Sequence, residues 1–372
     1  MQIQSSFADT YALARVKFLE GAAAAGMALA SHNHPLPGAQ GETLAMDVAR
    51  DGPMGAEKLL IVSSACHGAE GHCGSGVQVA ATHDAEWLAH ARAAGVAVLY
   101  IHALNPHGFS HSRRVTHENV DLNRNFQDFA QPLPHNPAYG ELHELLLPAT
   151  WPPSAENAAA IARWTDTHGL PRYQAAVSQG QHSHPDGMFF GGTAPTWSNQ
   201  TLRQVLRQHG QGARHVAWMD LHTGLGPSGV GERIWAGGND AQGIARAKRW
   251  WDGGGQTPIT SIYDGTSTSA LLTGLMWSSI HDECPAAAYT GIAMEYGTLP
   301  ILEVIQALRA DHWLHRETLR GHAVDPELAQ AIHQQMRNTF YVNTDGWRAQ
   351  VVAQARQALF QAVDGLVRES QE

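Results

Sequence analysis

The sequence LLIVSSACHGAEGHCGSG, residues 59–76, joins an apolar run to a polar, glycine-rich segment. The run from Leu59 to Val62 is short and rich in strand-forming residues, and turn-forming residues follow it, so it predicts a buried strand. Directly after the strand, His67 and Glu70 lie three residues apart. We therefore expect a loop at the carboxyl end of this strand to present an imidazole and a carboxylate together.

Other apolar runs also end in polar loops. Val96 to Ile101 leads into NPHGFSH, His215 to Asp220 leads into LHTGLGPSG, and Gly291 to Glu295 leads into YGTLP; an alternating segment from Glu42 to Val48 precedes them all. In open α/β sheets, ligands bind in the crevice at the carboxyl ends of the strands. These loops are therefore the predicted functional site.

Helical patterns alternate with the strand candidates. They cover about Val77 to Ala93, Ala155 to His168, Thr196 to Gln208, Ile301 to His315, Pro326 to Asn338 and Asp345 to Val367. This order favours an α/β fold with a mixed, largely parallel twisted sheet flanked by helices. With no repeat or linker evident, residues 1–372 are predicted to form one catalytic domain with a helical C-terminus. Residues 127–198, rich in Pro, His and Gly, predict an insertion that is partly loop.

Composition narrows the function classes. A formal charge of -10 and a charged fraction of 16% argue against a nucleic-acid partner. No run approaches the roughly 20 apolar residues that cross a bilayer. The alanine-rich segment from Gly21 to Ala30 lacks a preceding basic region, so we expect an N-terminal helix there and no signal peptide. Cys66, Cys73 and Cys284 form no CxxC pair, which predicts reduced thiols and a cytoplasmic protein.

A catalytic zinc site needs three protein ligands and one open position. After His67 and Glu70, the best third ligand is His222, which follows the apolar strand in MDLHTG, and Asp220 two residues earlier is a candidate to support it. Because the chain holds 23 histidines, HxxE alone is a weak signal. A pairing of His67 with His72 is the rival arrangement.

The segment HSRRVTHENVDLNRNF, residues 111–126, concentrates arginines in a short polar loop. Arg124 offers a planar fork for a carboxylate, and Asn123 offers an amide beside it. Arg113 or Arg114 would polarise a scissile carbonyl. A salt-bridged surface loop would equally account for any one of these arginines alone. At this point the choice between Arg113 and Arg114 is open.

Together these motifs resemble the zinc carboxypeptidase (funnelin) superfamily, which includes succinylglutamate desuccinylase and aspartoacylase relatives. HGAE resembles its HxxE ligand pair, NPHG its Asn-Pro-x-Gly turn and VDLNRNF its substrate-carboxylate motif, and they occur in the family's order. The resemblance spans Leu59 to Pro300. The strings GQHSHPDGMFFGG, LHTGLGPSGVGE and EYGT are most similar to an uncharacterised, mostly bacterial branch.

The resemblance implies one Zn²⁺ per chain, held by His67, Glu70 and His222, with Glu295 in AMEYGT as the general acid/base. It implies hydrolysis of an amide bond next to a free carboxylate, by attack of zinc-activated water. A small peptide or an N-acyl amino acid would be the substrate. A lid tyrosine is expected in the family, but neither Tyr263 nor Tyr289 has a matching context.

Three function classes follow from these residues. The first is a carboxypeptidase-type metallopeptidase, and the second is an N-acyl amino acid deacylase that uses the same groups. The third is a non-catalytic protein that binds a carboxylate, for which a missing ligand or a missing Glu295 would be the signature; all these positions are filled. A serine hydrolase is excluded because no GxSxG turn occurs between a strand and a helix.

Overall fold

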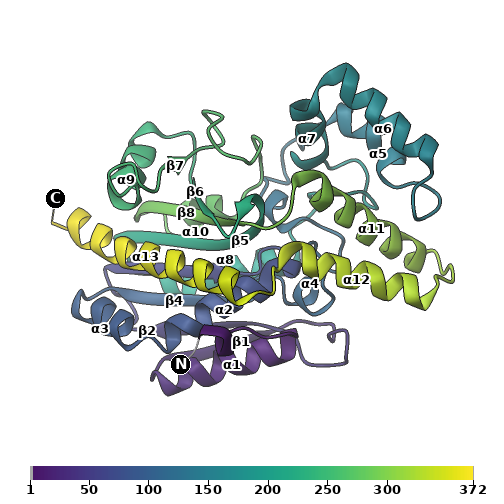
Figure 1. The fold of residues 1–372 in the computed structure, drawn as a ribbon. Helices are drawn as coiled ribbons and strands as arrows, with labels where there is room; N and C mark the ends of the chain where they lie inside the picture. The colour runs from purple at the N-terminus through teal and green to yellow at the C-terminus, as the bar shows by residue number, and fades with distance from the viewer. Residues whose placement is uncertain (1–2, 372) are drawn as a thin grey trace.

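A computed structural model describes residues 3–371, and its centre is an eight-stranded sheet in the order β1-β2-β4-β3-β5-β8-β6-β7 (Figure 1). The four central strands β4, β3, β5 and β8 run parallel, whereas β1 and β2 at one edge and β6 next to β8 pair antiparallel. The strands are β1 (Ala28–Asn33), β2 (Ala45–Asp51), β3 (Lys58–Ser64), β4 (Ala97–His102), β5 (His215–Ser228), β6 (Gly231–Trp235), β7 (Ile259–Thr260) and β8 (Ala288–Gly297). The predicted mixed, largely parallel sheet is confirmed.

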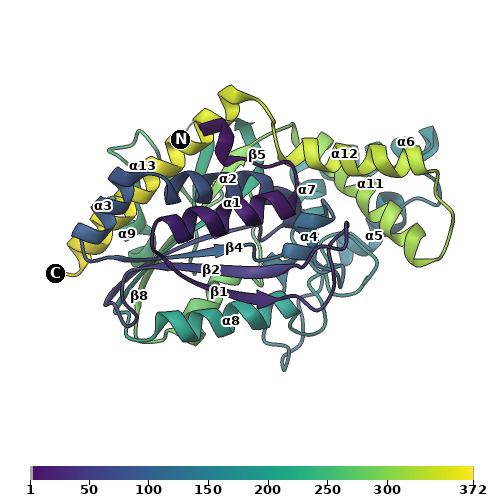
Figure 2. The same cartoon turned by 90° about the horizontal axis from the view of Figure 1, so that it is seen from below.

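Helices cover both faces of this sheet. Seen from below, α1, α2, α3 and α13 lie on one side and α8 on the other (Figure 2). The α-helices are α1 (Tyr11–Ala24), α2 (Gly71–Thr82), α3 (Ala85–Ala93), α4 (Pro106–Ser110), α5 (Pro137–Leu146), α6 (Ala155–His168), α7 (Leu170–Ser178), α8 (Trp197–Gly210), α9 (Ala241–Trp251), α10 (Ser279–Glu283), α11 (Ile301–Leu319), α12 (Pro326–Phe340) and α13 (Asp345–Glu369). Short 3₁₀ turns are η1 (Ile3–Ser6), η2 (Gly68–Glu70), η3 (Leu122–Arg124) and η4 (Met276–Ser278).

Strand β3 shows how the sequence divides the core between these two layers. Successive side chains of a strand point to opposite faces of the sheet. Leu60 and Val62 accordingly pack into the cluster formed with α2 and α13, whereas Leu59 and Ile61 pack into the cluster formed with α8. All four side chains are at most 1% exposed. The run is therefore apolar throughout because both of its faces are buried.

The order of strands creates a crevice where the predicted site lies. From β3 the chain crosses to β4 on one side, and β5 then pairs with β3 on the other side. A parallel sheet opens a ligand crevice at such a reversal of strand order, outside the carboxyl ends of the strands. The HGAE loop follows β3, and His222 lies on β5. The topology thus brings together residues that are more than 150 positions apart in sequence.

The structure corrects several predicted boundaries. The helical stretch from Val77 to Ala93 is two helices: α2 ends at Thr82, and Asp84 caps the start of α3 by accepting a hydrogen bond from the Trp87 amide. Strand β5 continues to Ser228, so His222 lies inside a strand and not after one. The segment from Gly21 to Ala30 is the end of α1, a turn and the start of β1. Strands β1, β6 and β7 were not predicted.

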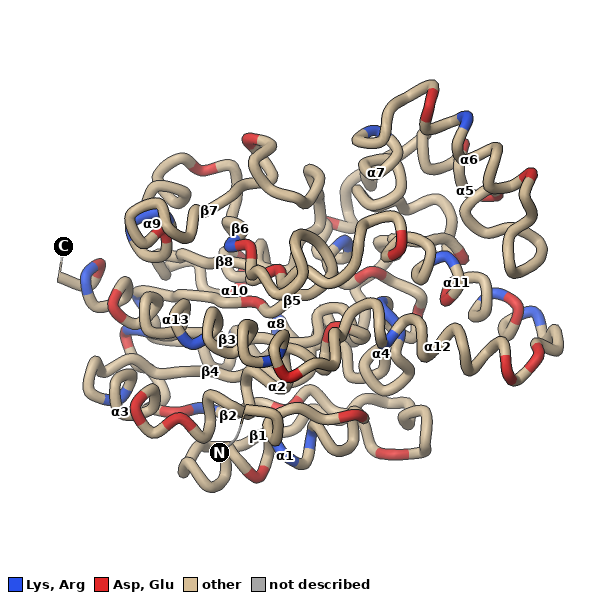
Figure 3. The backbone as a smooth tube through the Cα atoms, in the orientation of Figure 1, with Lys and Arg blue, Asp and Glu red and all other residues tan. Residues whose placement is uncertain are grey.

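The segment 127–198 contains α5, α6 and α7, which form the lobe beside α11 at the upper right of Figure 1. Tyr139 and Val177 of this lobe pack against Val304 and Leu308 of α11. This packing accounts for three helices in a segment that was predicted to be partly loop; of these helices, α6 was predicted and α5 and α7 were not. Both acidic and basic positions occur on this lobe and on α11, as Figure 3 shows. Among the described residues, no helix combines the length and apolarity of a membrane span.

Candidate metal centre

The HGAE loop is built against the NPHG turn. The Gly68 amide donates to the carbonyl of Arg114 (3.1 Å), and the Ala69 amide donates to the carbonyl of Arg113 (2.9 Å). A Cβ atom placed on Gly68 would lie only 2.0 Å from the carbonyl carbon of Gly108, so only glycine allows this approach. The two motifs and the arginine loop are therefore one packed unit.

His67, Glu70 and His222 converge as the sequence predicted. His67 Nδ1 lies 2.8 Å from Glu70 Oε1, and His222 Nδ1 lies 2.9 Å from Glu70 Oε2. One ligand atom from each residue lies within 4.8 Å of the other two, and all three side chains are buried. Two imidazoles and a carboxylate suit a divalent zinc ion with room for a fourth ligand. These residues fit the expected metal.

A carboxylate holds the other nitrogen of each imidazole. Asp220 Oδ2 contacts His222 Nε2, as expected for a supporting group, and Asp121 Oδ1 lies 3.2 Å from His67 Nε2. At His222 this partner fixes the tautomer, because a proton on Nε2 leaves the Nδ1 lone pair for a metal. At His67 the contact is shared, since Arg114 Nη2 also lies 2.9 Å from Nε2. Asp121 was not predicted, although its place in VDLNRNF gave a signal.

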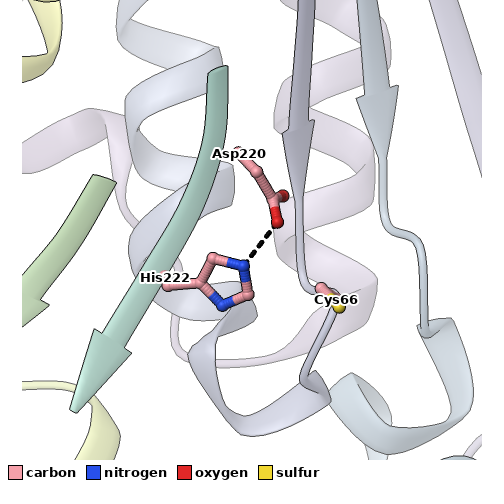
Figure 4. Close-up of side chains that lie close together, drawn as sticks. All are labelled: Cys66, Asp220 and His222. Carbon is pink, nitrogen blue, oxygen red and sulfur yellow. Dashed lines mark hydrogen bonds and ion pairs between the residues drawn. The ribbon is translucent and has the colours of Figure 1, made fainter. Parts of the chain in front are cut away.

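A second possible ligand set shares His222 with the first. Cys66, Asp220 and His222 also place one ligand atom each within 4.8 Å of the others, and Figure 4 shows one nitrogen of the His222 ring directed at Asp220, with Cys66 across from it. Burial, reinforced by Asp220 and Asp121, raises the pKa of the Cys66 thiol well above its usual value. Thiolate is the form that binds metals. Cys66 and Asp220 also do not line the pocket that opens onto His67, Glu70 and His222.

The rival pairing of His67 with His72 finds no support. His72 Nδ1 lies 3.0 Å from the carbonyl oxygen of Ala8, on the side of α2 that faces α1 and η1. Its ring packs edge-on against Phe109. Burial lowers the pKa of His72 to about 4, as is usual for a neutral core histidine. His72 is therefore a packing residue and belongs to neither ligand set.

The charges around the ligands also complement a divalent cation. Burial alone would raise the pKa of Glu70, but the imidazoles of His67 and His222 hold it below its usual value. Burial alone would lower the pKa of His222, but Asp220 and Glu70 raise it. The local carboxylates, Glu70, Asp121, Asp220 and Glu295, outnumber the guanidinium groups of Arg114 and Arg124 by two.

Glu295 lies beside the ligand set because β8 pairs with β5 in a register that places it opposite His222. The Leu225 amide donates to Glu295 Oε1 (2.9 Å) and fixes the carboxyl group at the pocket wall. Burial, followed by repulsion from Glu70, raises the pKa of Glu295 to about 7. A carboxyl group with such a pKa can accept and return a proton near neutral pH.

The structure separates the two neighbouring arginines. Arg113 is 5% exposed, donates through Nε to both carboxylate oxygens of Asp311 (3.2 and 3.1 Å) and does not line the pocket. Arg114 lines the pocket and donates to Asp121 Oδ2 (3.0 Å) and Glu70 Oε1 (3.2 Å). Of the two, only Arg114 is placed to reach a molecule bound in the pocket, whereas Arg113 anchors the loop to α11.

Asn123 and Arg124 line the same pocket. Arg124 is fixed by donating from Nη1 to the Asn123 carbonyl (2.9 Å) and from Nη2 to the Ser178 carbonyl at the end of α7 (2.5 Å). Its Nε has no partner although it is buried. A guanidinium group carries five N–H donors, so donors remain for a carboxylate. The hydrogen bond between Arg124 and Ser178, which lies inside the predicted insertion, could not be predicted from the sequence.

Phe189, from the string MFFGG, is a pocket residue that the sequence did not single out. The guanidinium carbons of Arg114 and Arg124 lie 5.0 and 5.8 Å from its ring centroid. Its backbone φ of 51° is costly for a bulky side chain, and strain of this kind persists where function constrains the chain. The ring is therefore a shared platform for both guanidinium groups.

Replacing Phe189 by leucine should lower kcat/KM for a carboxylate-bearing substrate about 10-fold, because two cation–π contacts are lost. Metal content should not change. Phe189→Tyr should restore activity, and Phe190→Leu, which alters a neighbour outside the pocket lining, should have little effect. Steady-state kinetics on the four proteins checks this. Equal losses in Phe189→Leu and Phe189→Tyr would contradict a role for the ring face.

Solved structures share this fold. The thrombin activatable fibrinolysis inhibitor matches with a TM-score of 0.54 and 10% identity, covering 96% of this chain and 74% of that one. The bovine form, in complex with tick carboxypeptidase inhibitor, gives 0.49 and 10% identity over 98% of both chains. A metallo-carboxypeptidase from Pseudomonas aeruginosa in complex with (2-guanidinoethylmercapto)succinic acid matches with a TM-score of 0.40 and 12% identity. The match covers 87% of this chain and 66% of that one. The first match, with a TM-score above 0.5, shows that this chain shares its fold with a solved structure.

Sequence comparison places the chain in a family. No curated protein matches it. The family model described as "Protein of unknown function (DUF2817)" matches residues 7–354, which include every residue of the candidate metal centre. The protein therefore belongs to the DUF2817 family.

Proposed function

We propose that this protein is a zinc-dependent hydrolase that cleaves an amide bond next to a free carboxylate, as a carboxypeptidase-type metallopeptidase acting on small peptides. The observation that carries the proposal is the meeting of three sets of groups in one pocket. These are the ligand set, the Glu295 carboxyl group, and the Asn123–Arg124 pair. Metal-assisted amide hydrolysis beside a carboxylate can use all three, as Lewis-acid site, proton carrier and anion-binding pair. One zinc ion per chain would occupy the set His67, Glu70 and His222.

A bound zinc ion would supply Lewis-acid chemistry, which activates water and polarises a carbonyl group. Glu295, with its raised pKa, takes the proton of the attacking water at its carboxylate and then delivers it to the leaving amine. Arg114 donates hydrogen bonds to the oxygen on which negative charge develops. Arg124, with Asn123 beside it, holds the substrate carboxylate and so aligns the scissile bond.

Arg114 and Arg113 should differ sharply when each is replaced by alanine. Arg114→Ala should lower kcat by about 10²-fold, the usual loss for one oxyanion donor, with metal retained. Arg113→Ala breaks a buried pair with Asp311, so its free energy of unfolding should fall by about 3 kcal/mol or more, while the folded fraction keeps kcat. Chemical denaturation and active-site titration separate the two effects. A loss of kcat in Arg113→Ala alone would reverse the assignment.

The test of the proposal is hydrolysis by zinc-loaded protein of matched peptides that differ only at the C-terminus. The peptide with a free C-terminal carboxylate should be cleaved. The peptide with a C-terminal amide should not be cleaved, because Arg124 then has no anion to hold. N-acyl amino acids belong in the same panel, since a deacylase would use the same groups. Cleavage of amidated and free peptides at equal rates would contradict the role of Arg124. No cleavage of any member, with zinc bound, would contradict the proposed function.

A further inference from the structure

The pocket beside the ligand set carries charge at one end only. Its charged and imidazole lining residues are His67, Glu70, Arg114, Arg124, His222 and Glu295, and each already has a place in the metal centre or the carboxylate-binding pair. The remaining lining residues are apolar or uncharged. A substrate group that extends away from the metal centre thus meets no charged partner among the described residues that line the pocket.

One apolar wall adjoins the carboxylate-binding pair. It consists of Ile234 on β6, Ile262 and Leu272 in the segment after β7, Leu275 and Trp277 around η4, and Ala293 on β8. All of these except Leu272 are buried, and they belong to the core cluster that packs on α8. We call this set the apolar wall. Because it is part of a packed core, it is rigid.

Two hydrogen bonds donated by backbone amides fix the distance between the wall and the carboxylate-binding pair. The Met276 amide donates to Asn123 Oδ1 (2.9 Å), and the Phe126 amide donates to the Gly274 carbonyl (3.1 Å). In an amino acid, the side chain and the carboxylate are attached to the same carbon. A carboxylate held by Arg124 therefore directs that side chain toward the apolar wall.

An acidic residue near the wall does not alter this conclusion. Glu232 is two residues before Ile234 on β6, so the two side chains leave the strand on the same side. Its carboxylate already accepts from Thr260 Oγ1 (2.6 Å) and the Thr268 amide (3.1 Å), and it does not line the pocket. Glu232 holds the segment after β7 in place, and its carboxylate is not among the described residues that line the pocket.

We propose that the pocket selects substrates whose carboxylate-bearing residue has an aliphatic or aromatic side chain, and that it discriminates against basic and acidic ones. This inference rests on the proposed function, which places the substrate carboxylate at Arg124. Burying an apolar side chain against the wall is favourable, whereas a charged group would lose its hydration without gaining a partner. Between leucine or phenylalanine and lysine or glutamate at that residue, we expect a ratio of kcat/KM of about 10- to 100-fold.

A charge placed on the wall should change the preference. Leu272 is half-buried, so Leu272→Asp should fold, and it should narrow the phenylalanine-to-lysine ratio of kcat/KM about 10-fold or more. Leu271 is the matched control: it is 60% exposed and outside the pocket lining, and Leu271→Asp should keep the wild-type ratio. An unchanged ratio in Leu272→Asp, or the same change in both variants, would overturn the inference.

A binding measurement separates this inference from the proposed reaction. Zinc-loaded Glu295→Gln is titrated by calorimetry with N-acetyl-phenylalanine, N-acetyl-lysine and N-acetyl-glutamate, so that no cleavage is needed. Tighter binding of the phenylalanine compound supports the inference even if the wild type hydrolyses nothing, an outcome that would contradict only the proposed function. Equal binding, preference for a charged compound, or no binding of any of the three overturns the inference, whereas hydrolysis without selectivity leaves the proposed function standing.

Discussion

Replacing Glu295 by glutamine should lower kcat by about 10³-fold and leave the metal content unchanged. Glutamine preserves the shape of the side chain but cannot accept a proton, and proton transfer by one positioned group contributes about 10²- to 10⁴-fold. The ligand set does not include Glu295, so zinc should still bind. Elemental analysis and steady-state kinetics on the same preparation measure both quantities.

The matched control for this variant is Glu303→Gln, which makes the same chemical change at an exposed position on α11. It should retain wild-type kcat. A Glu295→Gln protein with near wild-type kcat would refute the role of Glu295 in proton transfer. A Glu295→Gln protein without zinc would show that this carboxyl group is a ligand and not a base.

Replacing His67 by alanine should remove both the metal and the activity. His67 provides one of three ligands, and two ligands do not retain a catalytic zinc ion against dilution. The loss of activity should therefore reach the detection limit, and added zinc should restore little of it. Inductively coupled plasma analysis after dialysis, combined with an assay of the same sample, checks this result.

Cys66→Ala is the matched control, because Cys66 belongs only to the second ligand set. It should keep one zinc ion per chain and most of its activity. The variant loses little buried volume, so its stability should fall by about 1 kcal/mol. Loss of zinc in Cys66→Ala with retention in His67→Ala would move the metal to the set of Cys66, Asp220 and His222.

The sequence was informative where the candidate site residues lie at or near strand ends. The carboxyl ends of parallel strands meet at one edge of the sheet. Apolar runs that lead into HGAE, NPHG and MDLHTG therefore predicted that the candidate ligands His67, Glu70 and His222 come together, as they do. The fold class followed from the same pattern of strands and helices. Strand β1 escaped prediction because ALASHN, an exposed edge strand, has no apolar run.

Sequence could not choose between Arg113 and Arg114, because the choice depends on a distant partner. Asp311 on α11 lies 198 positions from Arg113 and holds it away from the pocket. The roles of Ser178 and Phe189 likewise depend on how the 127–198 lobe folds back on the arginine loop. Contacts at such separations are set by tertiary packing, and the spacing of residues within one motif does not predict them.

The measurement that most directly tests the central claim is the X-ray absorption spectrum of the zinc-loaded protein at the zinc edge. If His67, Glu70 and His222 hold the ion, the nearest shell should contain only nitrogen and oxygen at about 2.0–2.2 Å, with two imidazoles. A sulfur atom at about 2.3 Å in that shell would assign the metal to Cys66 and contradict the account.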